Sequence, residues 1–213
     1  MTIHDRAVSV CEKVIFWSII GIPFAASFSS AAVEGLAAIL IVTFVLKKLL
    51  VQQKALAFHP VLGWFLLLIG LSLLSFLNTV NIAASVQGVA KLLKYGFVVM
   101  IVLGEVCDPG HVQKIILAAV LGVFLASLDG IYQLGFGVDL LRHKEPNTVI
   151  GLTRLNATFP NSNLFAGYLI LFIPVLVSLV LYHLKERQRF FGTVIAVLAL
   201  FCLVFTFCRS AAL

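Results

Sequence analysis

Long apolar stretches recur along the whole chain and are separated by short polar segments. A helix needs about 20 mostly apolar residues to cross a ~30 Å hydrocarbon core, so the pattern predicts about seven membrane spans. The first two share Val14–Leu46, with a break supplied by Pro23 and the Ser27–Ser30 cluster. The other five predicted spans are His59–Leu77, Val89–Val106, Val112–Leu134, Leu164–Tyr182 and Phe190–Cys208.

The polar segments between these stretches predict turns and loops. Asn78–Gln87 is expected to be a surface turn, and Gly135–Asn161 is the longest polar stretch. The chain is 62% hydrophobic and only 11% charged, whereas soluble domains carry about 25% charged residues. We therefore expect an all-α, polytopic transmembrane helical bundle, with one transmembrane domain over residues 1–213.

The positions of the cations predict the orientation, because Lys and Arg in loops collect on the cytoplasmic side. A cytoplasmic N-terminus places nine of the 15 cations inside: Arg6, Lys13, Lys47, Lys48, Lys54, Lys114, Lys185, Arg187 and Arg189. Six lie outside: Lys91, Lys94, Arg142, Lys144, Arg154 and Arg209. With the charges distributed in this way, the net charge of +6 indicates membrane topology and not a nucleic-acid partner.

External cations oppose the usual bias and need a reason. One reason is snorkelling of long side chains to lipid headgroups. The other is an anionic ligand on the outer face. Lys91 and Lys94 illustrate the choice: they share a helix face at i and i+3, and they form either a solvated interfacial face or a cationic wall of a binding site.

The polar segment Gly151–Asn163 is the strongest candidate for chemistry. Arg154 is either an interfacial anchor or a clamp for a phosphate, since its planar donors match phosphate oxygens. The following helix is expected to start near Pro160–Asn163, which would turn its free N–H groups and positive dipole end to the same compartment. Capping explains one of the asparagines Asn161 and Asn163. With Thr158 they leave a surplus of polar groups suited to sugar or phosphate.

Two further observations limit the chemistry. Arg209 ends the last predicted span and either terminates it or shares a cavity with Arg154. Asp129 and Gln133 lie four residues apart near the outer end of their span. No metal-binding or nucleotide-binding motif occurs, and the four cysteines have no ligand spacing. We expect no metal and no cofactor.

Residues 154–168 read RLNATFPNSNLFAGY, and residues 206–211 read TFCRSA. The first stretch resembles the pattern R-x-x-G-T-F-x-N-P-N-x-x-A-G-Y and the second resembles T-x-S-R-[GS]-A, which are both signatures of the O-antigen ligase and polymerase family. The chain departs from the pattern in three places. Pro160 precedes Asn161 instead of separating the two asparagines, Ala157 stands for a glycine, and Cys208 stands for a serine.

The resemblance implies a membrane glycosyltransferase of the bacterial inner membrane, active in lipopolysaccharide or polysaccharide biosynthesis. It would take a glycan from an undecaprenyl diphosphate carrier and pass it to lipid A core or to a growing polysaccharide, without a metal. Arg154 and Arg209 would be catalytic, and Lys91, Lys94, Thr158, Asn161 and Asn163 would bind substrate. Partners would be the carrier-linked glycan, the acceptor and membrane lipid, with no nucleic acid.

Family members continue into a large external loop after the region that matches, so the resemblance makes this chain the N-terminal part of a longer protein. Two alternatives stay open. The chain could transport an anionic or lipid-linked solute, which would require helices broken near the midplane. It could also be a non-catalytic membrane subunit.

Overall fold

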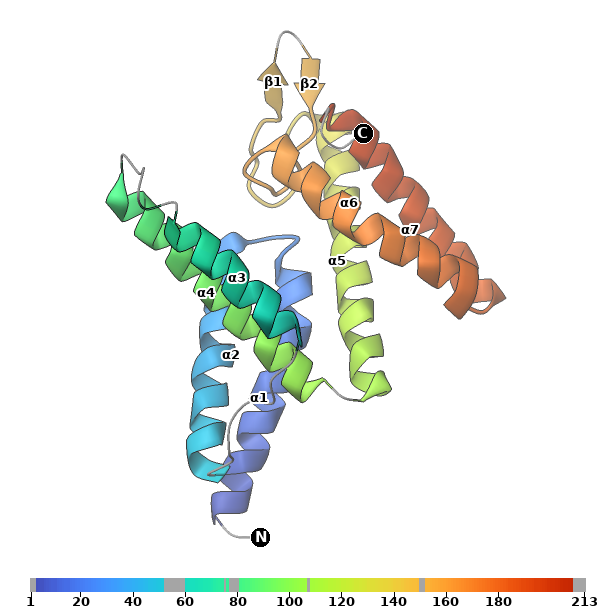
Figure 1. Cartoon of the computed structure of the whole chain (residues 1–213). Coiled ribbons are helices and arrows are strands. Elements are labelled where there is room, and N and C mark those ends of the chain that lie inside the picture. The colour runs from blue at the N-terminus through green and yellow to red at the C-terminus, as the bar shows by residue number, and fades with distance from the viewer. Residues whose placement is uncertain are drawn as a thin grey trace. The chain divides into compact units, whose positions relative to one another are not determined.

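The computed structural model describes residues 3–51, 60–74, 76, 81–106, 108–149 and 152–208. These ranges hold seven α-helices and one short pair of strands (Figure 1). The helices are α1 (Ile3–Ala25), α2 (Ser30–Val51), α3 (Pro60–Leu74), α4 (Ile82–Glu105), α5 (Pro109–Phe136), α6 (Ser162–Ser178) and α7 (Glu186–Phe205). The π-helical turn η2 (Leu179–His183) continues α6. The expected all-α bundle is confirmed.

Five helical stretches within the described ranges are long and apolar enough to cross a membrane: His4–Ala25, Ile82–Glu105, Pro109–Phe136, Ser162–His183 and Glu186–Phe205. The chain is accordingly a multi-pass membrane protein, with five spans meeting this criterion against the seven predicted. The helix over the third predicted span, α3, is apolar but has only 15 residues.

Two predicted boundaries change. The first break lies at the serines alone, because α1 continues through Pro23 to Ala25 and α2 starts at Ser30. The predicted turn at Asn78–Gln87 is wrong from residue 82 onward. Asn81 caps α4 there, its Oδ1 accepting the N–H of Ala84 at 3.1 Å. The cap starts the helix early, so Lys91 and Lys94 lie in its third and fourth turns.

The chain forms two compact units, and the prediction of a single domain stays a prediction. Unit 1 comprises Met1–Ile19 and Glu34–Gln113; unit 2 comprises Ile20–Val33 and Lys114–Leu213. In unit 1, Lys47 forms ion pairs with Glu12 on α1 and Glu105 on α4, at 3.3 and 2.8 Å. This cluster joins three helices of unit 1.

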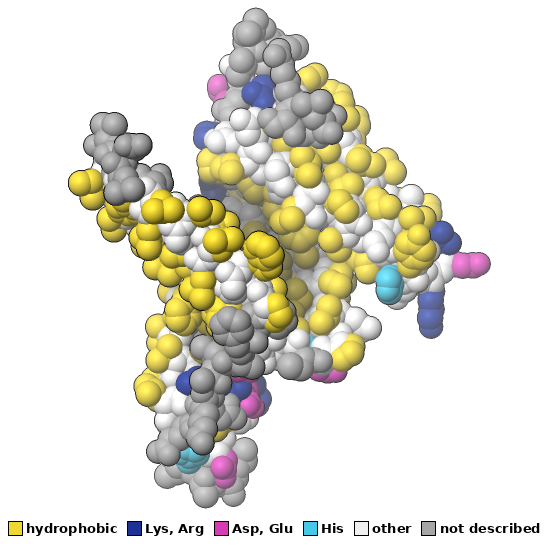
Figure 2. Space-filling view, viewed as in Figure 1, with side chains coloured by type: hydrophobic (Ala, Val, Ile, Leu, Met, Phe, Trp, Pro, Cys, Tyr) yellow, Lys and Arg dark blue, Asp and Glu magenta, His cyan; other side chains and the backbone are white. Residues whose placement is uncertain are grey.

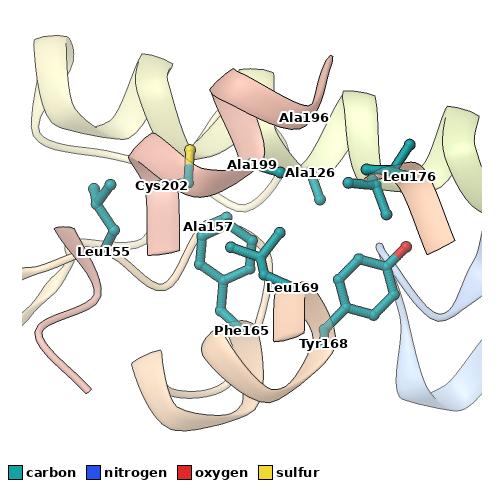
Figure 3. Packing of buried hydrophobic residues seen from close by; sticks show 11 residues of the cluster. Ala126, Leu155, Ala157, Phe165, Tyr168, Leu169, Leu176, Ala196, Ala199 and Cys202 are labelled. Atoms are coloured by element: carbon teal, nitrogen blue, oxygen red, sulfur yellow. The ribbon is translucent and has the colours of Figure 1, made fainter. Parts of the chain in front are cut away.

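The main hydrophobic core lies in unit 2, where α5, α6 and α7 meet (Figure 3). Small residues permit the close approach: a Cβ built on Gly130 would lie 3.2 Å from Cys202 Sγ and 3.4 Å from the Phe165 ring. Close packing of this kind holds membrane helices together, because lipid tails are as apolar as the helices. Leu155 and Ala157 extend the core into the loop before α6.

The long polar stretch between α5 and α6 contains an element that was not predicted. β1 (Asn147–Val149) pairs antiparallel with β2 (Leu152–Arg154), with Asn147 opposite Arg154. Arg154 is thus the last residue of a strand. Its position is fixed by a ladder on one side and by the segment leading to α6 on the other.

Candidate functional site

Arg154 lies at the junction of β2, the start of α6 and the end of α7. Its Nε donates to the backbone carbonyl of Thr206 at 2.9 Å, and its Nη2 donates to Asn163 Oδ1 at 2.9 Å. A guanidinium has five N–H donors, and acceptors among the described residues bind two of them. In the part of the chain that the structure describes, no carboxylate lies within ion-pair distance of Arg154. Within the described ranges, the hydrogen-bond acceptors of its side chain are neutral oxygens.

Backbone contacts fix this arrangement further. The N–H of Leu155 donates to the carbonyl of Phe205 at 3.1 Å, and the hydroxyl of Ser162 donates to the carbonyl of Arg154 at 3.4 Å. Arg154 and Leu155, at the start of the first signature-like stretch, therefore contact Thr206, the first residue of the second stretch, and Phe205, the residue before it. Arg209 follows Thr206 by three positions and lies outside the described residues.

The start of α6 matches the prediction closely. Asn161 is the N-cap, and its Oδ1 accepts the N–H of Leu164 at 2.8 Å. Asn161 thus has a capping role, whereas Asn163 is exposed and orients Arg154. The first N–H groups of a helix lack intrahelical acceptors and carry its positive dipole end. This helix end adds to the positive potential at Arg154.

Gln133 on α5 holds the loop before α6 in place by hydrogen bonds, a role that was not predicted from the sequence. Its buried Oε1 accepts the N–H groups of Asn156 and Ala157 at 3.1 and 2.9 Å. Its Nε2 donates to Asn156 Oδ1 at 3.0 Å and to the carbonyl of Lys144 at 3.4 Å. One carboxamide therefore fixes the backbone two residues after Arg154. A polar residue within an apolar span was the available signal.

The two aspartates of this region hold the loop backbone. Asp129 Oδ1 accepts the N–H of Leu140 at 2.7 Å. The fully buried Asp139 accepts the N–H groups of Arg142 and Lys144 at 2.9 and 2.5 Å. These bonds fold residues 139–144 into a closed turn beneath the Arg154 segment. The two carboxylates thus have a structural role, because they accept hydrogen bonds from the loop backbone.

Thr158 has a structural role in this arrangement. It is buried, and its hydroxyl donates to the carbonyl of Ser27 at 2.7 Å. This bond ties the loop to the turn after α1. The prediction that Thr158 binds substrate stays a prediction. The preceding residue, Ala157, has φ of +45°, a left-handed conformation that favours glycine.

Lys91 and Lys94 belong to unit 1 and α4, and the prediction that they support Arg154 stays a prediction. Lys94 forms an ion pair with Glu34 of α2. The same carboxylate accepts the hydroxyl of Tyr95 at 2.9 Å, and Lys94 Nζ lies 4.8 Å from the Tyr95 ring centroid. Lys94 thus has a protein counter-ion, while Lys91 is exposed.

The described residues contain no group of three or more His, Cys, Asp or Glu side chains that could hold a metal ion. No family model, curated protein or solved structure matches this chain. The site is characterised by its own geometry: Arg154 lies beside a capped helix start and above a buried set of polar groups around Gln133.

Proposed function

We propose that this chain is a membrane glycosyltransferase of the O-antigen ligase and polymerase type in the bacterial inner membrane. It would transfer a glycan from an undecaprenyl diphosphate carrier to lipid A core or to a growing polysaccharide. The observation that carries the proposal is the pairing of Arg154 with Thr206, because it joins the two signature-like stretches. Arg154 in the first stretch and Thr206 in the second are 52 residues apart in the chain, and their contact supports a shared site.

The conformation of Ala157 adds support. The family's pattern has glycine at this position, and Ala157 is the residue of the 152–163 segment with positive φ among those described. A left-handed backbone is the physical reason to prefer glycine there. The local backbone thus agrees with the pattern even where the residue departs from it.

The chemistry follows from the donors that Arg154 retains. An acceptor hydroxyl attacks the anomeric carbon, the bond from that carbon to the diphosphate oxygen breaks, and its electron pair leaves with the diphosphate. The guanidinium would stabilise that developing charge with paired, charge-assisted hydrogen bonds. The hydroxyl proton needs a general base, which the resemblance assigns to the external loop that follows the matched region in the family.

A deletion strain tests this proposal. Loss of the gene should cause carrier-linked glycan to accumulate, and the full-length gene should clear it. Full-length Arg154→Ala should fail to clear it while remaining in the membrane at normal levels. Arg142→Ala is the matched control, since Arg142 lies in the same loop but donates to the carbonyl of Phe28 at 2.8 Å. Unchanged levels of carrier-linked glycan in the deletion strain would contradict the proposal and leave the transporter and subunit alternatives.

A further inference from the structure

A second group of cations lies at the other end of α6 and α7, where the chain passes from η2 into the first turn of α7. Lys185, Arg187 and Arg189 are all exposed, and the neighbouring acid is Glu186. Three cations and one carboxylate give this turn a charge of +2. No ion pair involves these cations among the described residues. Figure 2 shows cationic side chains projecting from this end of the hairpin. We name it the basic turn.

Exposed aromatic side chains flank the basic turn on both helices. Tyr182 is 79% exposed, Phe190 is 68% exposed and Phe191 is 59% exposed. Both flanking helices are long and apolar enough to span a membrane, so the turn lies at a membrane surface. Aromatic rings and cations at the ends of spans are the side chains suited to the headgroup layer.

The stability of α7 does not explain these cations. Arg187 and Arg189 follow the first residue of α7 by one and three positions, where the helix dipole disfavours positive charge. The N-cap residue Lys185 makes no side-chain capping bond. Each cation therefore weakens the helix start slightly. A negative charge outside the protein would offset that cost.

The backbone at the turn is closely packed. A Cβ on Gly192 would lie 2.8 Å from both Leu184 Cδ1 and Val180 Cγ2, so these side chains would have to shift to admit one. The N–H of Leu184 donates to the carbonyl of Leu179 at 3.1 Å and ends the π-helical turn. The cations and the aromatic rings are therefore presented together.

We propose that the basic turn binds the headgroups of anionic phospholipids and anchors unit 2 at a fixed depth in the membrane. The lipid phosphate meets Lys185, Arg187 and Arg189 while the aromatic rings occupy the level of the glycerol backbone. The predicted orientation places this turn at the cytoplasmic leaflet, which carries the anionic lipids. Each Lys or Arg near such a surface strengthens binding by about fivefold.

Local fluorescence quenching tests this surface. The substitution F190W, in a W17F/W64F background, puts one tryptophan beside the cations of the full chain. The protein is reconstituted in phosphatidylcholine vesicles that contain the same minor fraction of either brominated phosphatidylglycerol or brominated phosphatidylcholine. We expect the brominated phosphatidylglycerol to quench at least about twofold more, because it is enriched at the turn. Equal quenching by the two lipids would overturn the proposal.

Three variants separate headgroup charge from other causes. The substitutions K185Q/R187Q/R189Q should bring the two lipids to equal quenching, and K185R/R187K/R189K should keep the excess. E186Q should increase the excess, and it keeps the test valid if the triple glutamine variant does not fold. An excess that persists in K185Q/R187Q/R189Q, or that falls in E186Q, would contradict the proposal.

Discussion

Arg154 and Lys94 carry the same charge and were both predicted to belong to the site, Arg154 as a catalytic residue and Lys94 as a substrate-binding residue, but their surroundings differ. Arg154 donates to a carbonyl and to a carboxamide, both neutral, at 2.9 Å each. Lys94 forms an ion pair with Glu34, whose side chain is 42% exposed. A cation held by neutral acceptors keeps its charge and its spare donors for a ligand. A cation with a carboxylate beside it already has its counter-ion.

The largest difference between the two should appear in glycan transfer. We expect Arg154→Ala to lose about 100-fold or more of transfer activity, the usual effect of removing a charge-stabilising donor. Lys94→Ala should change activity by less than about threefold, since its charge is balanced by Glu34. Rates measured with carrier-linked glycan would check both. A similar loss of transfer activity in the two variants would contradict the proposed difference between Arg154 and Lys94.

The scaffold beneath Arg154 should show the largest effect on stability. Gln133→Leu leaves the buried N–H groups of Asn156 and Ala157 without acceptors, at about 1–3 kcal/mol for each unpaired group. Thermal unfolding in detergent should show a clear fall in the midpoint, together with loss of transfer. The Lys94–Glu34 pair, by contrast, is a contact between two partly exposed side chains. A midpoint within a degree or so of the parent would show that Gln133 does not hold the loop.

Removing the counter-ion of Lys94 should have a small effect. Glu34→Gln replaces an exposed ion pair with a weaker hydrogen bond, so the free energy of unfolding should change by less than about 1 kcal/mol. The variant also leaves Lys94 without its counter-ion. If the variant binds carrier-linked glycan more tightly than the parent, Lys94 belongs to the binding site. Unchanged affinity would mean that Lys94 does not contact the ligand.

The smallest effect is expected at Ala157. Ala157→Gly relieves a left-handed backbone worth about 1 kcal/mol but removes a buried methyl group worth about as much. Stability should therefore stay within about 1 kcal/mol of the parent, with transfer retained. Ala157→Val is the matched control and should lose both, because a β-branched residue tolerates positive φ poorly. Retention of both in Ala157→Val would contradict the role of this turn.

The features that could be predicted are those set by residues close together in the sequence. The Ser27–Ser30 break, the start of α6 after Asn161 and the apolar helices all follow from local capping and hydrophobic length. Asn81 shows the limit: one capping bond started α4 before its apolar stretch, and composition alone suggested a turn. The pair β1–β2 was missed because three-residue strands carry almost no periodic signal.

Partners distant in the chain could not be predicted. Gln133 and Asn156 are 23 residues apart, and Lys94 and Glu34 are 60 residues apart. Their pairing depends on how helices pack, which no local pattern encodes. The same limit applies to Thr158, whose hydroxyl donates to the carbonyl of Ser27, 131 residues earlier.

Counting bound lipid by native mass spectrometry tests the central claim most directly. The purified chain is titrated with undecaprenyl diphosphate and, separately, with undecaprenyl monophosphate. The account predicts that the diphosphate binds more tightly, that Arg154→Ala weakens its binding at least about tenfold, and that Arg142→Ala leaves it unchanged. Equal binding of the diphosphate by Arg154→Ala and by the parent chain would contradict the account.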